Sequence, residues 1–125
     1  MKSILVVDDD PLVGKVVQRM LDVDGWIVRL ARDGRDALEK VAEQAPDLIV
    51  TDIVMPNMEG LEVILALRKS NPHLPIIAVS GGGILKDLDY LDFAGKLGAR
   101  ATLTKPFRRD DLLRAVREVF DDTPE

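Results

Sequence analysis

The sequence predicts an α/β fold, a five-stranded parallel sheet with helices on both faces. Two observations lead to this prediction. Five short apolar runs alternate with amphipathic helical patterns along the chain, and such alternation is typical of strands joined by crossover helices. Each run is almost wholly apolar and ends on turn-forming or polar residues, as expected of strands that are buried on both faces. Right-handed crossovers then favour a doubly wound (βα)5 sheet of strand order 2-1-3-4-5.

The strands are predicted at the apolar runs and the helices between them. We expect strands at residues 4–7, 26–30, 48–52, 76–80 and 101–104, and helices at about 11–24, 34–44, 60–70, 84–97 and 109–120. Asp10 is expected to cap the first helix, with Pro11 at its first position. The apolar stripe of this helix, which we expect to face the core, consists of Leu12, Val13, Val16, Val17, Met20 and Leu21.

The composition excludes several classes of protein. The chain of 125 residues has no cysteine, so disulfides and thiolate metal sites are excluded, and its net charge of −5 argues against non-specific binding to nucleic acid. No apolar run approaches the roughly 20 residues that span a bilayer. We expect one cytoplasmic domain over residues 1–121, a short acidic tail over 122–125, and neither direct nucleic-acid binding nor a membrane partner.

Polar side chains stand where several of the predicted strands end. Asp8 and Asp9 follow the first strand, Asp52 ends the third, Ser80 ends the fourth and Lys105 follows the fifth. The carboxyl ends of parallel strands meet at one edge of the sheet, and the strand order places the first and third strands side by side at the switch point. The sequence therefore predicts that three carboxylates converge there, with a hydroxyl and an ammonium group nearby.

Such a cluster favours a hard cation and phosphoryl chemistry. Two carboxylates about 5 Å apart repel by roughly 3 kcal/mol at an effective dielectric constant of about 20, so three together need a counter-charge. Oxygen ligands without cysteine or histidine suit Mg²⁺ best, with Mn²⁺ or Ca²⁺ as alternatives. A carboxylate beside Mg²⁺ and a lysine is placed to attack phosphorus, while the cations neutralise charge on the phosphoryl oxygens.

The same residues carry a resemblance to a known family. The segment from Val6 to Asp9, then Asp52 with Met55-Pro56 and Gly60, then Ser80, and finally Lys105-Pro106-Phe107 resemble a response-regulator receiver domain, the phosphoacceptor of two-component signalling. The resemblance covers essentially the whole chain and implies a flavodoxin-like fold. It also implies a signalling domain that catalyses only its own phosphorylation and dephosphorylation.

The resemblance implies a role for each site residue. Asp52 would be phosphorylated, Asp9 would bind Mg²⁺ directly, Asp8 would act through metal-bound water and Val54 would offer its backbone carbonyl. Ser80 would be the switch hydroxyl and Lys105 the phosphoryl-binding cation, with a cis Lys105–Pro106 bond. The implied partners are a histidine kinase or histidine phosphotransfer protein and a downstream protein. That downstream protein would bind the face formed by the fourth helix, fifth strand and fifth helix.

Two features depart from the family pattern. The family usually has Tyr or Phe three residues before its lysine, where this chain has Thr102. Three consecutive glycines, Gly81 to Gly83, follow Ser80, and we expect them to make the entry to the next helix mobile.

Three alternatives stay open at this level. The chain could be a stand-alone receiver, as we expect, or a receiver cut from a longer protein. It could be a small aspartyl-phosphate phosphatase with Asp8 as the nucleophile, because Asp8 and Asp10 have the Asp-x-Asp spacing of such enzymes, although Leu12 stands where they carry Thr or Val. It could also be a receiver-like scaffold that is never phosphorylated.

Overall fold

The computed structural model describes residues 2–22, 25–53, 60–80 and 98–122. Its strands are β1 (Ser3–Val7), β2 (Ile27–Ala31), β3 (Leu48–Asp52), β4 (Ile76–Ser80) and β5 (Ala101–Thr104). Its helices are α1 (Pro11–Asp22), α2 (Gly34–Glu43), α3 (Gly60–Ser70) and α5 (Arg109–Asp122). The predicted helix at 84–97, the glycine run at 81–83 and Val54 lie outside the described residues.

The five strands form one parallel sheet in the order β2-β1-β3-β4-β5. This confirms the predicted topology, in which β1 and β3 are neighbours. β3 and β4 are buried along their whole length, as expected from the apolar residues that make up most of each strand. β2 and β5 are the edge strands and are more exposed.

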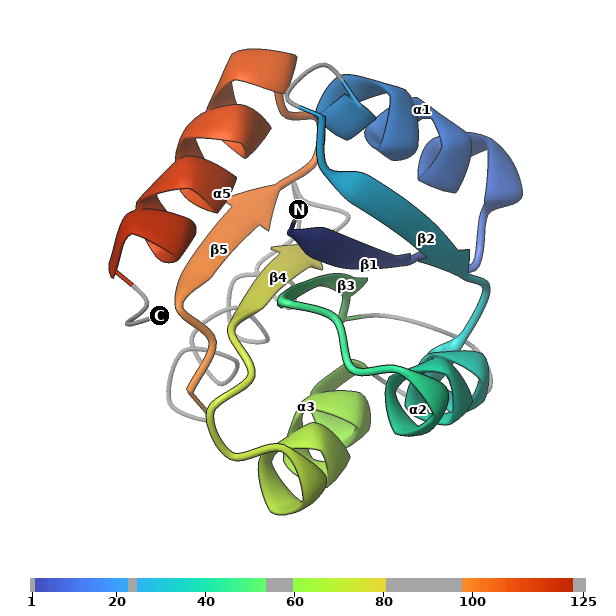
Figure 1. Cartoon of the computed structure of the whole chain (residues 1–125). Helices are drawn as coiled ribbons and strands as arrows, with labels where there is room; N and C mark the ends of the chain where they lie inside the picture. The colour runs from blue at the N-terminus through green and yellow to red at the C-terminus, as the bar shows by residue number, and fades with distance from the viewer. Residues whose placement is uncertain (1, 23–24, 54–59, 81–97, 123–125) are drawn as a thin grey trace.

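The sheet separates two apolar layers (Figure 1). Helices α1 and α5 cover one face, and α2 and α3 cover the other. Alternate residues of each strand point into opposite layers, so Ile4 and Val50 pack with α1 and α5, whereas Leu5 and Ile49 pack with α2 and α3. Each strand is therefore held from both sides, which fixes the positions of the strand ends.

Aspartate side chains cap the N-termini of α1 and α2. Asp10 Oδ1 accepts a hydrogen bond from the backbone N–H of Leu12 at 2.9 Å, and α1 begins at Pro11, as predicted. Asp33 caps α2 in the same way by accepting from the N–H of Asp36 at 2.8 Å. Only three residues consequently separate the end of β1 from the start of α1, and the chain turns sharply just after Asp8 and Asp9.

The predicted core-facing stripe of α1 is partly wrong. Leu12 is 73% exposed and Val16 is 51% exposed. The buried residues of α1 are Gly14, Val17 and Leu21, and at 3.6 residues per turn Leu12 and Val16 lie about 160° around the helix from Gly14. α1 carries apolar residues on both sides, and the small Gly14, which lies against Leu30, marks the side that faces the sheet.

None of the helices in the described part of the chain is long and apolar enough to cross a membrane.

Candidate functional site

Backbone hydrogen bonds continue the sheet just beyond three strand ends. The N–H of Asp8 donates to the carbonyl of Ala31 at 3.1 Å, and the N–H of Ile53 donates to the carbonyl of Val79 at 2.9 Å. The N–H of Lys105 donates to the carbonyl of Ser80 at 2.8 Å. These bonds fix the residues that follow β1, β3 and β5 in register, so the backbone that carries the side chains at this edge is held in place.

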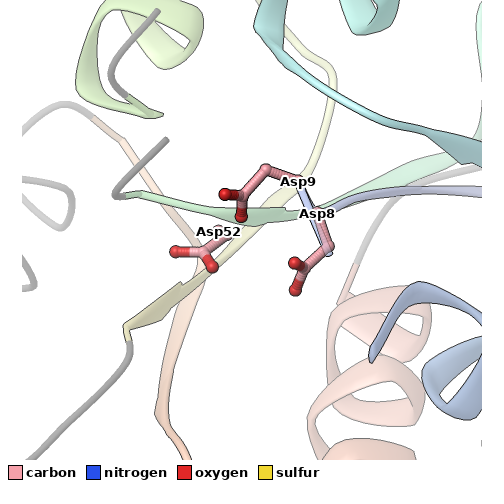
Figure 2. A group of neighbouring side chains, drawn as sticks. All are labelled: Asp8, Asp9 and Asp52. Atoms are coloured by element: carbon pink, nitrogen blue, oxygen red, sulfur yellow. The ribbon is translucent and has the colours of Figure 1, made fainter. Parts of the chain in front are cut away.

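Three carboxylates meet at this edge, as the sequence predicts. Asp8, Asp9 and Asp52 each offer an oxygen, and these oxygens all lie within 4.8 Å of one another. Figure 2 shows the adjacent side chains of Asp8 and Asp9 beside that of Asp52, which comes from β3. Asp8 and Asp52 are both 7% exposed, whereas Asp9 is exposed. Two nearly buried carboxylates thus share the site with one that solvent reaches.

Lys105 joins this cluster from the end of β5. Its Nζ donates to Asp8 Oδ2 at 2.8 Å and to Asp52 Oδ2 at 3.0 Å. Burial of the ammonium group lowers the pKa of Lys105, but the hydrogen bonds and negative charges of Asp8 and Asp52 outweigh burial and raise the pKa above its ordinary value. Lys105 is therefore fully charged at neutral pH and compensates one of the three carboxylates.

Asp8 is held more firmly than the sequence indicates. Its Oδ1 accepts the backbone N–H of Asp10 at 2.9 Å, while its Oδ2 accepts from Lys105. The resemblance implies a role for Asp8 through metal-bound water and does not indicate this direct ion pair with Lys105. The two residues are 97 positions apart, and no local pattern relates them.

The structure also locates three other features that the comparison with the family pattern singled out. Ser80 is completely buried at the end of β4, where it pairs in register with Thr104. The Lys105–Pro106 bond is cis, as the resemblance implies. Thr102 lies exposed on the edge strand β5.

Comparison with known proteins decides the family. The family model for the response regulator receiver domain matches residues 4–117. The chain belongs to this family. Its fold is accordingly that of the flavodoxin-like receiver domains, which are the phosphoacceptor signalling domains of two-component response regulators, and the phosphatase alternative is not favoured.

The relatives include regulators that are about twice as long. The response regulator MprA of Mycolicibacterium vanbaalenii is 39% identical over 118 residues, which are 94% of this chain and 49% of MprA. The probable transcriptional regulatory protein TcrX of Mycobacterium tuberculosis is 33% identical over 119 residues and is matched over 49% of its length. The chain thus spans about half the length of the curated relatives that it matches.

Solved receiver domains match the fold closely. A CheY-like receiver domain protein from Methanospirillum hungatei has 31% identity and a TM-score of 0.89, with 98% of this chain and 96% of that chain covered. The chemotaxis protein CheY4 of Vibrio cholerae has 30% identity and a TM-score of 0.84, with 95% and 98% covered.

The carboxylates of this receiver domain carry more negative charge than Lys105 compensates. Three carboxylates and one ammonium leave two negative charges in excess. Receiver domains typically bind Mg²⁺ at such an acidic cluster, and the hard oxygens here fit that ion.

We expect Asp9→Asn to stabilise the protein in metal-free buffer, because it removes one like charge from the cluster. The free energy of unfolding should rise by about 1 kcal/mol, less than the unscreened repulsion because Asp9 is exposed. Urea unfolding in EDTA measures this change. Asp10→Asn is the matched control, since Asn caps a helix as well as Asp and Asp10 is not one of the three grouped carboxylates. Equal effects of the two variants, or destabilisation by Asp9→Asn, would show that repulsion at the cluster is not a cost to folding.

The raised pKa of Lys105 predicts a specific pH dependence. Because the folded pKa lies above the ordinary lysine value of 10.5, Lys105 contributes its full stabilisation below that pH, and the contribution is lost as the pH rises through the folded pKa. The difference in unfolding free energy between the wild type and Lys105→Met should therefore be constant near neutrality and shrink above pH 10.5. A difference that grows in alkali would mean that the ammonium group gains nothing from Asp8 and Asp52.

Proposed function

We propose that this receiver domain accepts a phosphoryl group from a phosphohistidine onto Asp52. The observation that supports this most strongly is the position of the Asp52 carboxylate, which lies at the end of β3 in the acidic cluster with Lys105 Nζ 3.0 Å away. A carboxylate oxygen of Asp52 forms the new bond to phosphorus, and the bond between phosphorus and the imidazole nitrogen of the donor breaks. The imidazole leaves with the electron pair of that bond and takes up a proton.

The other site residues support this transfer. The ammonium group of Lys105 binds the phosphoryl group and neutralises negative charge on its oxygens. Ser80, at the end of β4, is the switch hydroxyl. Bound Mg²⁺ supplies further neutralisation of the phosphoryl oxygens. Asp9, Asp52 and the carbonyl of Val54 would hold it, and Asp8 would contribute through water.

Phosphorylation acts as a signal by shifting the balance between two conformations. It favours the conformation in which the phosphoryl group makes better contacts. The domain remains a phosphoacceptor and turns over no other substrate. Its donor is a histidine kinase or a histidine phosphotransfer protein. Its downstream target is a protein that binds the face of β5 and α5, which we expect to include the helix predicted at 84–97. We place this signalling in the cytoplasm.

Labelling with acetyl phosphate tests the proposed function most simply. We expect intact-protein mass spectrometry to show one added phosphoryl group in the presence of Mg²⁺ and none in EDTA. No labelling in Mg²⁺ would favour a scaffold that is never phosphorylated, and labelling that is equally fast in EDTA would remove the proposed role of the cation.

Mg²⁺ should also stabilise the folded domain, because the ion binds the assembled cluster. At an ion concentration ten times its dissociation constant the gain is about 1.4 kcal/mol. Asp9→Asn should lose most of this gain, whereas Asp10→Asn should keep it.

A further inference from the structure

A cavity adjoins the acidic cluster at the carboxyl end of β2, with Asp8 in its lining. It has a volume of about 420 Å³ and is lined by residues of α1, of α2 and of the end of β2. Figure 1 shows these three elements on the same side of the molecule. Gly14 and Leu30 contribute an apolar wall, and Lys15, Arg32 and Lys40 bring three cationic side chains to its lining. The volume falls within the usual range for small-molecule sites, about 300–1,000 Å³.

One carboxylate organises the cationic side of this cavity. Asp36 Oδ1 accepts from Lys40 Nζ at 2.7 Å, and Asp36 Oδ2 accepts the backbone N–H of Arg32 at 3.0 Å. Burial raises the pKa of Asp36, but these two hydrogen bonds and the charges of Lys40 and Arg32 outweigh burial and lower its pKa. Asp36 is therefore ionised at neutral pH and holds Lys40 and the Arg32 backbone in place.

The charges of the cavity do not balance. The lining holds three cations and two carboxylates, Asp36 and Asp8, of which Asp8 is also bound to Lys105 at 2.8 Å. Within the part of the chain that the structure describes, neither Lys15 nor Arg32 has a carboxylate within 4.0 Å of its side-chain nitrogens. The lining thus has a net charge of +1, in a chain whose net charge is −5.

We propose that this cavity binds a phosphate monoester. Such a group carries about −1.5 to −2 charges at pH 7, and the cations of the lining, which outnumber its carboxylates, attract it. Arg32 can contact two phosphate oxygens at once, and Lys15 adds a mobile point charge. The apolar surface of Gly14 and Leu30 suits the organic part of the ester, so a bare phosphate ion should bind more weakly.

The binding test uses backbone amide NMR of the Asp52→Asn protein in EDTA. This variant and the chelator prevent phosphorylation and metal-bound phosphate, so the result does not depend on the proposed phosphoryl transfer. The probe is adenosine 5′-monophosphate, with adenosine and inorganic phosphate as partial ligands. We expect saturable shifts at Gly14, Leu30 and Arg32, weaker binding of inorganic phosphate, and none of adenosine at the same concentrations.

Charge variants decide whether the cavity is the site. Lys15→Gln and Arg32→Gln should each weaken binding about tenfold or more, whereas Arg19→Gln, which removes an exposed cation of α1 outside the cavity lining, should leave it unchanged. Shifts that do not saturate, that centre on Lys105, or that weaken equally in Arg19→Gln would overturn the proposal.

Discussion

Asp52→Asn is expected to abolish labelling by acetyl phosphate, the largest effect that the site predicts. An amide oxygen is a poor nucleophile toward phosphorus, and Asp52 is the only one of the three carboxylates that ends β3. The variant should still fold, because Asn has nearly the same shape and removes one of three clustered negative charges. Intact-protein mass spectrometry in the presence of Mg²⁺ measures whether the phosphoryl group is still added.

Two matched variants make this experiment specific. Asp10→Asn removes a carboxylate at a neighbouring strand end and should be labelled at the rate of the wild type. Asp8→Asn should be labelled more slowly but at the same residue. If labelling persisted in Asp52→Asn and vanished in Asp8→Asn, the phosphatase reading with Asp8 as nucleophile would be right after all.

Lys105→Met is expected to slow phosphorylation about 100-fold, the range found when one preorganised electrostatic group is removed from a reacting centre. The ammonium group of Lys105 lies 3.0 Å from an oxygen of the accepting carboxylate. It is therefore placed to meet the negative charge that the phosphoryl group brings. The rate of labelling by acetyl phosphate at fixed Mg²⁺ measures the loss.

Metal binding should respond to Lys105→Met in the opposite direction. Without the ammonium group no lysine compensates the negative charge of the three carboxylates. Mg²⁺ should therefore bind at least as tightly as in the wild type. Lys69→Met, which removes an exposed lysine of α3, should change neither quantity. A labelling rate within twofold of the wild type, or a loss of Mg²⁺ affinity together with rate, would show that Lys105 does not act on the phosphoryl group.

Much of the fold could be predicted because strands and helix starts are specified by short stretches of sequence. The apolar runs at 48–50 and 76–79 favour burial on both faces, and alternation with helices then limits the strand order. Asp10 and Asp33 identify two helix starts by the chemistry of capping. The convergence of Asp8, Asp9 and Asp52 followed from topology alone, since parallel strands end at the same edge.

The sequence did not predict features that depend on how distant parts of the chain pack together. Apolar residues on both sides of α1 suggested a broad core-facing stripe, but the burial of Gly14, Val17 and Leu21 shows which side meets the sheet. The ion pair between Asp8 and Lys105 joins residues that are 97 positions apart. The cavity lined by Lys15, Arg32 and Lys40 likewise combines cations from three elements, and sequence spacing carries no sign of it.

Mapping the phosphoryl group on the unmodified protein tests the central claim most directly. After treatment with acetyl phosphate and Mg²⁺, reduction with borohydride converts an aspartyl phosphate to homoserine, and peptide mass spectrometry locates the change. The account predicts conversion at position 52 alone, and none when EDTA replaces Mg²⁺. Conversion at position 8 or 9, or an unmodified position 52 in a labelled protein, would contradict it.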